Sequence, residues 1–195
     1  MPRSGAEARR RLREAALELY LERGFDRTTA AEIAARAGVN ERTFFRHFPD
    51  KREVLFDGEA DLRAALMRAV AEAPEGLEPF EVLLSAFRTS ARNLEHNRPY
   101  SQPRWRVIAA TPALRERELA KHALLIDAVA EALRQRGIPD GVARLAARTG
   151  WAAYQHAVQA WVDDPAQSPE AHLQRAFDEL RALATAPTRR RPPGG

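Results

Sequence analysis

Four closely spaced polar residues, Glu41, Arg42, Thr43 and Arg46, have side chains that could contact the edges of DNA bases. Arginine can bond guanine through O6 and N7, and glutamate can accept a hydrogen bond from cytosine N4. A short helix beginning after Asn40 would place these side chains on its outward, N-terminal part. That part of a DNA-reading helix meets the bases, so the pattern predicts sequence-specific DNA contact.

The residues before this helix indicate how it is held. Thr29 and Glu32 have the spacing of a capping box, which predicts the start of a preceding helix. Gly38 permits a sharp turn after that helix. Asn40 is a suitable N-cap for the second helix. These elements predict a helix-turn-helix motif, which places its second helix in the DNA major groove.

The inner face of the second helix is aromatic. Phe44 and Phe48 are four residues apart and are expected to point into a small core. Pro49 ends the helix, because proline cannot donate to the hydrogen-bond ladder and disfavours helical geometry at the residue before it.

Composition narrows the class of protein. The chain has 195 residues, 45% of them hydrophobic, and no cysteine, which excludes disulfides, thiolate metal sites and a cysteine nucleophile. No apolar run reaches the ~18 residues of a membrane span, and no secretory signal is recognisable, so we expect a cytoplasmic protein without membrane association. Formal charge is +3 over residues 1–56, −2 over 57–188 and +3 in the arginine run 189–191. A basic N-terminal part beside a mildly acidic body suits a DNA-facing domain on a second domain.

The sequence predicts an all-α fold of about nine helices, because no segment alternates at period two. We expect a helix-turn-helix domain over residues 1–50, a ligand-binding and dimerisation domain over 51–186, and a disordered tail over 187–195. Besides the two helices of the motif, the expected helices are 6–23, 51–73, 77–96, a short one at 103–109, 112–136, 139–163 and 169–185.

The stretch ERGFDRTTAAEIAARAGVNERTFFRHFPDKREVL, residues 22–55, resembles the N-terminal domain of TetR-family transcriptional regulators. The shared elements fix turns, caps, core and outward residues together over about a quarter of the chain. The resemblance implies an α-helical homodimer whose first three helices bind operator DNA, and whose remaining helices bind a small-molecule effector. The run RWRVIAATPALRER at 104–117 is similar to regulators with acyl-coenzyme-A-type ligands.

The resemblance also implies contacts to DNA phosphates. His47, expected to be exposed, is assigned to a phosphate, as are Thr29 and Lys51, which are expected at helix N-termini. Phe45 stands where relatives often have tyrosine, and it cannot make the hydrogen bond of that hydroxyl. The predicted DNA-binding residues are Thr29, Asn40, Glu41, Arg42, Thr43, Phe45, Arg46, His47 and Lys51.

The larger domain is rich in bulky apolar residues. Each would more simply be core, but within a TetR-like fold some should line a cavity for an apolar or amphipathic effector. The predicted pocket residues are Leu62, Leu66, Phe80, Leu84, Phe87, Arg88, Trp105, Ile108, Leu125, Trp151 and Tyr154. Four arginines, Arg88, Arg92, Arg104 and Arg106, could bind a carboxylate or phosphate of that effector.

The last two expected helices predict a homodimer interface in the form of a four-helix bundle. The first of them carries a narrow seam of mostly small residues, Leu145, Thr149, Ala153 and Ala157, with Ala146 and Gly150 beside it. The terminal helix has a strong apolar stripe: Leu173, Ala176, Phe177, Leu180 and Leu183.

Signals of catalysis are missing from the sequence. The five histidines share no metal-ligand spacing, and there is no phosphate-binding glycine loop and no G-x-S-x-G motif. We therefore expect no enzyme activity, metal or cofactor. The primary hypothesis is a ligand-responsive transcriptional repressor with a roughly palindromic operator. Two alternatives are a sequence-indifferent architectural DNA-binding dimer and a ligand-binding helical protein that has lost operator binding.

Overall fold

A computed structural model describes residues 3–164 and 166–185 of the chain. These residues form nine α-helices and one short 3-10 helix, with no strand among them, so the all-α prediction is confirmed over the described ranges. The expected tail over 187–195 lies outside them. The helices are α1 (Arg3–Arg23), α2 (Ala30–Arg36), α3 (Glu41–His47), η1 (Glu53–Phe56), α4 (Glu59–Ala71), α5 (Pro79–His96), α6 (Arg98–Ala110), α7 (Pro112–Gln135), α8 (Asp140–Asp163) and α9 (Pro169–Thr185).

The expected helix-turn-helix geometry is present in α2 and α3. The capping box is formed, with the Glu32 backbone nitrogen donating to Thr29 Oγ1 (3.2 Å) and the Thr29 nitrogen donating to Glu32 Oε2 (2.8 Å). Gly38 has φ = 68°, a left-handed conformation that turns the chain between the helices. Asn40 Oδ1 then accepts from the Thr43 nitrogen at 2.8 Å and fixes the start of α3.

The junction after α3 differs from the predicted continuous helix over 51–73. Asp50 Oδ1 accepts from the backbone nitrogens of Arg52 (2.7 Å) and Glu53 (3.2 Å), which starts a turn leading into η1. Gly58 then has φ = 87°, which interrupts the helical path, and α4 begins only at Glu59. Val54 and Leu55 are buried, so the apolar pattern continues through the break and hides it in the sequence.

The sixth helix is longer than the expected 103–109. Helix α6 starts at Arg98, and the Asn97 carbonyl accepts from the nitrogens of Tyr100 (2.9 Å) and Ser101 (2.8 Å). Pro103 lies inside this helix instead of opening it. The prediction treated Pro103 as the start of the helix, whereas the Asn97 carbonyl accepts the first helical hydrogen bonds and Pro103 lies in the second turn.

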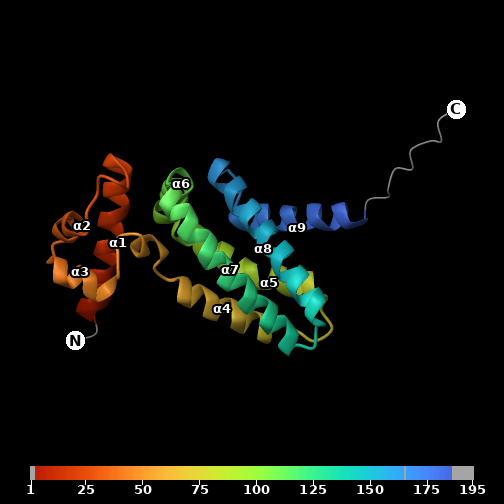
Figure 1. The fold of residues 1–195 in the computed structure, drawn as a ribbon. Coiled ribbons are helices and arrows are strands. Elements are labelled where there is room, and N and C mark those ends of the chain that lie inside the picture. Colours follow the sequence, from red (N-terminus) through yellow and green to blue (C-terminus); the bar gives the residue numbers. More distant parts are fainter. Residues whose placement is uncertain (1–2, 165, 186–195) are drawn as a thin grey trace.

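The described chain has two hydrophobic clusters. The N-terminal cluster joins α1–α3 to η1 and also includes Val107, Ile108 and Leu114 of α6 and α7. The larger cluster joins α4, α5, α7, α8 and α9. Figure 1 shows α1–α3 at one end of an elongated molecule and α9 at the other, with α6 beside α1. The N-terminal cluster extends past residue 50 to Phe56, and the domain boundary expected at residue 50 remains a prediction.

Most of the residues predicted for the dimer interface pack within the chain itself. Phe177 is fully buried, with its ring centroid 6.3 Å from those of Phe80 and Phe87 on α5. A Cβ at Gly150 would lie 2.7 Å from Leu83 Cδ1, so this glycine lets α8 approach α5 closely. The sequence pattern could not tell an intrachain partner from a second copy. Leu145 and Leu183 alone of the bulky residues in the two predicted sets are largely exposed, at 63% and 78%.

None of the described helices is both long enough and apolar enough to cross a lipid bilayer.

Candidate functional site

The outward face of α3 carries charged side chains that have no partner inside the described chain. Glu41, Arg42, Phe45 and Arg46 are exposed, and Thr43 is half-buried. Arg42 and Arg46 make no hydrogen bond or ion pair with any residue of 3–164 or 166–185. Phe44 and Phe48 are buried on the opposite face and anchor the helix. The helix therefore presents two free guanidinium groups from a rigid support.

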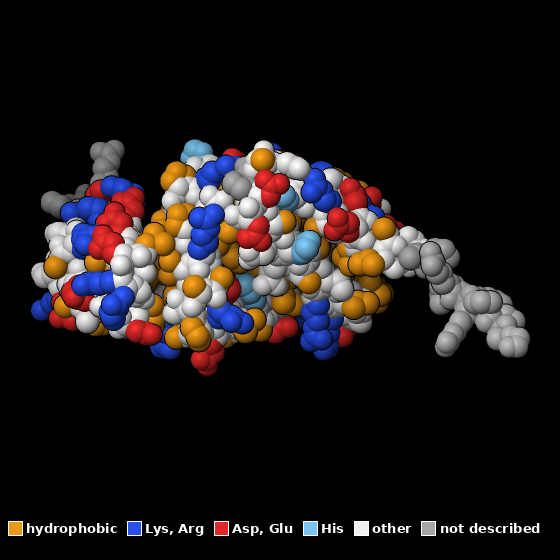
Figure 2. Space-filling model, turned by 90° about the horizontal axis from the view of Figure 1, so that it is seen from above, with side chains coloured by type: hydrophobic (Ala, Val, Ile, Leu, Met, Phe, Trp, Pro, Cys, Tyr) orange, Lys and Arg blue, Asp and Glu red, His pale blue; other side chains and the backbone are white. Residues whose placement is uncertain are grey.

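Most other arginines of the N-terminal domain do have partners within the chain. Arg10 pairs with Glu7 and Glu14, and Arg36 pairs with Glu18 and Glu22. Figure 2 shows basic and acidic side chains side by side on this end of the molecule. The paired arginines contribute little net potential, so the positive charge available to a phosphate or base comes from arginines without a carboxylate partner in the described part of the chain: Arg42 and Arg46 on α3, Arg11 on α1 and Arg27 in the loop before α2.

Two predicted phosphate ligands, Thr29 and Lys51, make internal contacts. The Thr29 hydroxyl is engaged by Glu32 in the capping box. Lys51 Nζ donates to the carbonyl oxygens of Phe25 and Thr28, both at 2.8 Å, and lies 4.1 Å from the centroid of the Phe25 ring. Lys51 does not begin a helix, contrary to the prediction. Its amine fastens the loop between α1 and α2, a role that spacing in the sequence could not reveal.

His47 is less exposed than predicted. It is half-buried, and its Nε2 has no hydrogen-bond partner among the described residues. Desolvation, followed by the nearby Arg46 and Arg9 charges, lowers the pKa of His47. The ring is therefore expected to be neutral at pH 7, and it is a hydrogen-bonding group rather than a cation for a phosphate.

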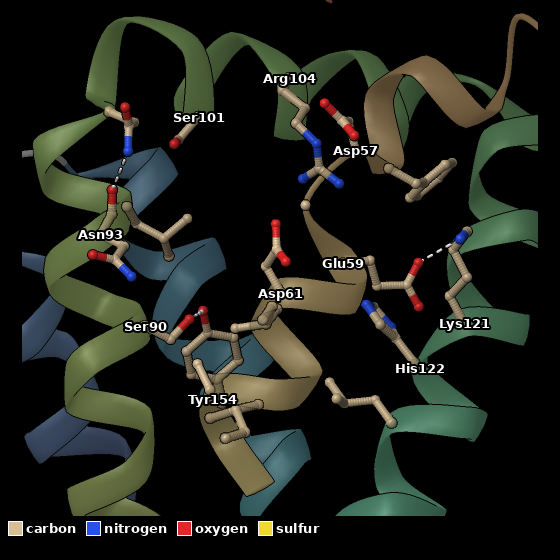
Figure 3. Close-up of a pocket in the computed structure, with 18 of the residues that line it drawn as sticks. Asp57, Glu59, Asp61, Ser90, Asn93, Ser101, Arg104, Lys121, His122 and Tyr154 are labelled. Carbon is tan, nitrogen blue, oxygen red and sulfur yellow. Dashed lines mark hydrogen bonds and ion pairs between the residues drawn. The ribbon is translucent and has the colours of Figure 1, made fainter. Parts of the chain in front are cut away.

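A cavity of about 540 Å³ lies between α4, α5, α6, α7 and α8. Figure 3 shows polar groups entering it from several helices, including Arg104 from α6, His122 from α7 and Tyr154 from α8. Its volume is within the ~300–1,000 Å³ usual for ligand pockets. Aromatic and aliphatic side chains make up its apolar wall, so it suits a ligand with an apolar body.

Six of the eleven predicted pocket residues line this cavity: Leu62, Leu66, Trp105, Leu125, Trp151 and Tyr154. The other five do not. Ile108 belongs to the N-terminal cluster, and Phe80, Leu84 and Phe87 face α9 or the core between helices. Arg88 donates to Gln174 Oε1 at 2.6 Å on α9. The apolar stripe of α5 is wide enough to serve the core and the cavity, and the sequence does not separate the two sides.

Besides its acids and bases, the cavity wall carries hydroxyl and ring groups that are hydrogen-bonded and uncharged. The hydroxyls of Ser90 and Tyr154 are 2.7 Å apart, and Gln155 Nε2 is 3.1 Å from His122 Nδ1. Burial raises the pKa of Tyr154 to about 12, and burial followed by the Arg104 charge lowers the pKa of His122 to about 4. At pH 7 both side chains are neutral.

One end of the cavity belongs to the N-terminal domain and the junction. Arg13 of α1 and Asp57 line its wall, and Arg13 Nε is 3.6 Å from Asp57 Oδ2. Arg9 of the same helix donates to Asp57 Oδ1 at 2.7 Å. Asp57 therefore links α1 to the start of α4 beside the cavity. Sequence reasoning missed Arg13, Asp57, Glu118 and His122, because nothing in local spacing brings residues so far apart together.

Comparisons with known proteins identify the family. Residues 12–57 match the family model described as bacterial regulatory proteins, tetR family, and residues 77–185 match the MftR C-terminal domain. The second match extends over more than half of the chain. The chain belongs to the TetR family. It therefore has an N-terminal helix-turn-helix DNA-binding domain and a C-terminal ligand-binding domain, as the resemblance implied.

The sequence of this TetR-family chain is similar to those of three named relatives. It is 32% identical to Thermus thermophilus FadR, a TetR-family transcriptional repressor solved with lauroyl-CoA, over 96% of this chain and all of that one, with a TM-score of 0.57. It is 26% identical to MftR of Mycobacterium tuberculosis over 93% of this chain and 96% of that one. It is 40% identical over 73 residues to TcmR of Streptomyces glaucescens, a match that spans about a third of each chain, 37% and 32%. These relatives are transcriptional regulators.

Proposed function

We propose that this TetR-family regulator is a repressor released from its operator by a small amphipathic effector. The observation that carries the proposal is the composition of the cavity wall. Arg13 of α1 and Asp57 of the junction form one end of it, so a ligand in the cavity would touch the DNA-binding domain directly. Ligand occupancy and the orientation of α1 are then physically coupled.

On the DNA side, Arg42 and Arg46 are the proposed base-reading residues. Both are exposed on α3 and unpaired within the described chain, and each can bond guanine O6 and N7. Glu41 and Thr43 are proposed as neighbouring contacts to bases, and Phe45 as an apolar contact to a thymine methyl group. Thr29, Asn40, His47 and Lys51 are proposed to meet phosphates beside α3, through backbone groups or through side-chain atoms that their internal hydrogen bonds leave free.

We further propose a homodimer that uses the outward faces of α8 and α9. Leu145 and Leu183 are exposed on these helices and need a partner surface. A two-fold dimer would set two α3 helices about one DNA turn apart, ~34–36 Å, or slightly more, so the operator should be roughly palindromic. Binding to chromosomal DNA also implies action in the cytoplasm.

On the effector side, the apolar wall suits a hydrocarbon or aromatic body, and lauroyl-CoA in the FadR complex supports a ligand with an acyl chain. Release requires that the effector binds the state with displaced reading helices more tightly than the DNA-bound state. The architectural alternative gives no reason for a cavity of about 540 Å³ next to the junction, and we do not favour it.

The experiment is a gel-shift titration of the full chain with operator fragments selected from the host genome, in the presence of unrelated competitor DNA. We expect a specific complex that dissociates when lauroyl-CoA or dodecanoate is added. Equal affinity for operator and competitor would contradict the proposal and favour the architectural alternative. Ligand binding without any DNA shift at low salt would instead indicate a chain that has lost operator binding.

A further inference from the structure

Arg104 is a half-buried cation that has no ion-pair partner among the described residues. Its Nε donates to the Leu55 carbonyl, and its guanidinium lies 5.6 Å from the Phe56 ring centroid. Among residues 3–164 and 166–185, no carboxylate oxygen lies within 4.0 Å of its nitrogens. Figure 3 shows the guanidinium directed into the cavity. A half-buried guanidinium has lost part of its hydration, which is costly unless an anion pairs with it.

The other charges of the wall do not fill this role. Asp57 is held by Arg9, and Glu59 by Lys121 at 2.5 Å. Burial is the main cause that raises the pKa of Glu118, which favours its neutral form. Arg13 is near enough to act on Arg104 as a like charge. Asp61 also lines the wall, with its carboxylate turned toward the Arg104 end of the cavity (Figure 3), but it forms no ion pair with Arg104. This end of the cavity thus brings two guanidinium groups together, and Arg104 has no ion-pair partner among the described residues.

Of the four arginines that the sequence suggested as ligands of an effector anion, Arg104 alone lines the cavity. Arg88 donates to Gln174, and Arg106 donates to the Val162 carbonyl at 3.4 Å. Arg92 is exposed and donates to the Arg88 carbonyl at 3.4 Å. Arg88, Arg92 and Arg106 are not part of the cavity wall, whereas Arg104 is.

We propose that Arg104, assisted by Arg13, forms a carboxylate-binding end of the cavity, and that the effector is an apolar acid carrying a free carboxylate. This inference rests on the proposed function and specifies the chemistry of its ligand. Guanidinium and carboxylate match in geometry through two parallel hydrogen bonds. The apolar body of the acid would extend from there along Trp105, Trp151 and Leu66.

The free acid is favoured over its coenzyme A thioester by the charges around the cavity. A thioester carbonyl is neutral and would leave Arg104 without a counter-charge. The phosphates of coenzyme A would have to lie at the exposed part of the wall, which consists of Gly58, Asp61, Arg68, Thr89, Asn93 and Asn97. One acid, one base and four neutral residues provide no excess positive charge for several phosphates.

The test is calorimetric titration of the full chain with dodecanoate, dodecanol and lauroyl-CoA, which share one chain length. Dodecanoate should bind at least about tenfold more tightly than dodecanol, as a hydrogen-bonded charge pair implies. In Arg104→Gln this preference should disappear while the dodecanol affinity stays unchanged, which also shows that the cavity is intact. Arg106→Gln removes the same charge from the same helix outside the wall and should behave like the wild type.

A second variant guards against misfolding of Arg104→Gln. Asp61→Asn removes a wall carboxylate that has no ion-pair partner among the described residues, and it should strengthen dodecanoate binding without changing dodecanol binding. The proposal is overturned if dodecanol binds as tightly as dodecanoate, if only lauroyl-CoA binds, or if none of the three probes binds. Specific operator binding is measured separately. If it persists while the acid fails to bind, the carboxylate site is wrong and the proposed function stands.

Discussion

Arg42 and Arg46 illustrate how a residue's role depends on its partners rather than on its charge. Arg10 and Arg36 have the same charge but are neutralised by glutamates within hydrogen-bonding distance. The α3 arginines have no such partner in the described chain, so an external acceptor can bind them without displacing an internal one. This distinction rests on side-chain placement and is invisible in the net charge of the segment.

Replacing Arg42 by alanine should weaken binding to the operator more than binding to unrelated DNA. The expected loss of specific affinity is about 1–3 kcal/mol, roughly ten- to a hundredfold, because a guanine contact is removed. Fluorescence anisotropy with operator and scrambled duplexes measures both affinities. Arg148→Ala on the exposed surface of α8 changes the net charge equally and should leave the ratio unaltered. An equal loss on both duplexes would show that Arg42 meets phosphates only.

Burial of His122 predicts that the stability of the folded chain depends on pH. Its pKa is lowered to about 4 in the folded chain, from an ordinary value near 6.5, because the ring is buried beside Trp151 and near Arg104. The unfolded chain therefore takes up a proton at higher pH than the folded chain. The stability associated with the neutral ring is present above about pH 6.5 and is lost as the pH falls toward about 4.

Between pH 7.5 and pH 5, this difference should reduce the free energy of unfolding by about 2 kcal/mol. Urea denaturation of the wild type and of His122→Gln at both pH values measures the contribution. The variant should lose about 2 kcal/mol less than the wild type over this interval. His156→Gln, an exposed histidine of α8, should retain the wild-type difference. Identical losses in wild type and His122→Gln would contradict the neutral buried ring.

At the scale of elements, local chemistry predicted some boundaries and not others. The starts of α2 and α3 follow from Thr29 and Asn40, whose side chains cap the adjacent backbone. The break at Gly58 was missed because Val54, Leu55 and Phe56 keep an apolar pattern through it. Part of the predicted dimer stripe of α9 was assigned to a second copy although it packs inside the chain, since Phe177 lies against Phe80 and Phe87. Contacts between distant segments decide such questions, and one sequence does not contain them explicitly.

The link between α1 and the junction should control the response to effector. Asp57 has a side chain only 8% exposed and pairs with Arg9 at 2.5 Å. In Asp57→Asn, α1 would be held less firmly beside the cavity, with a loss of stability of about 1–2 kcal/mol. The ratio of operator affinities without and with effector should fall by about fivefold or more.

Gel-shift titrations with and without dodecanoate measure that ratio. Asp127→Asn, an exposed acid of α7 outside the cavity wall, is the matched control and should preserve it. If Asp57→Asn keeps the wild-type ratio, the effector signal does not pass through this ion pair.

At the scale of the whole molecule, the proposed dimer carries two DNA-reading α3 helices, one from each subunit. The outward faces of α8 and α9 lie far from α3 (Figure 1), so dimerisation there leaves both reading helices accessible. Leu145→Glu should raise the dimer dissociation constant at least about tenfold, since it places a charge where an apolar side chain of ~1.5–3 kcal/mol would be buried. Analytical ultracentrifugation measures the change.

Leu119→Glu serves as the control for that experiment. Leu119 is equally exposed, at 64%, but lies on α7. The Leu119→Glu variant should sediment like the wild type. A Leu145→Glu variant that stays dimeric would show that another face forms the interface.

The measurement that bears most directly on the central claim is sequencing of the duplexes that the full chain selects from a random DNA pool, compared between wild type and Arg42→Ala. The wild type should enrich an inverted repeat whose half-site centres are about 10 base pairs or slightly more apart. Arg42→Ala should relax the base preference at one symmetric pair of positions. An unenriched pool, or a motif without inverted symmetry that Arg42→Ala leaves unchanged, would contradict a dimer that reads DNA through α3.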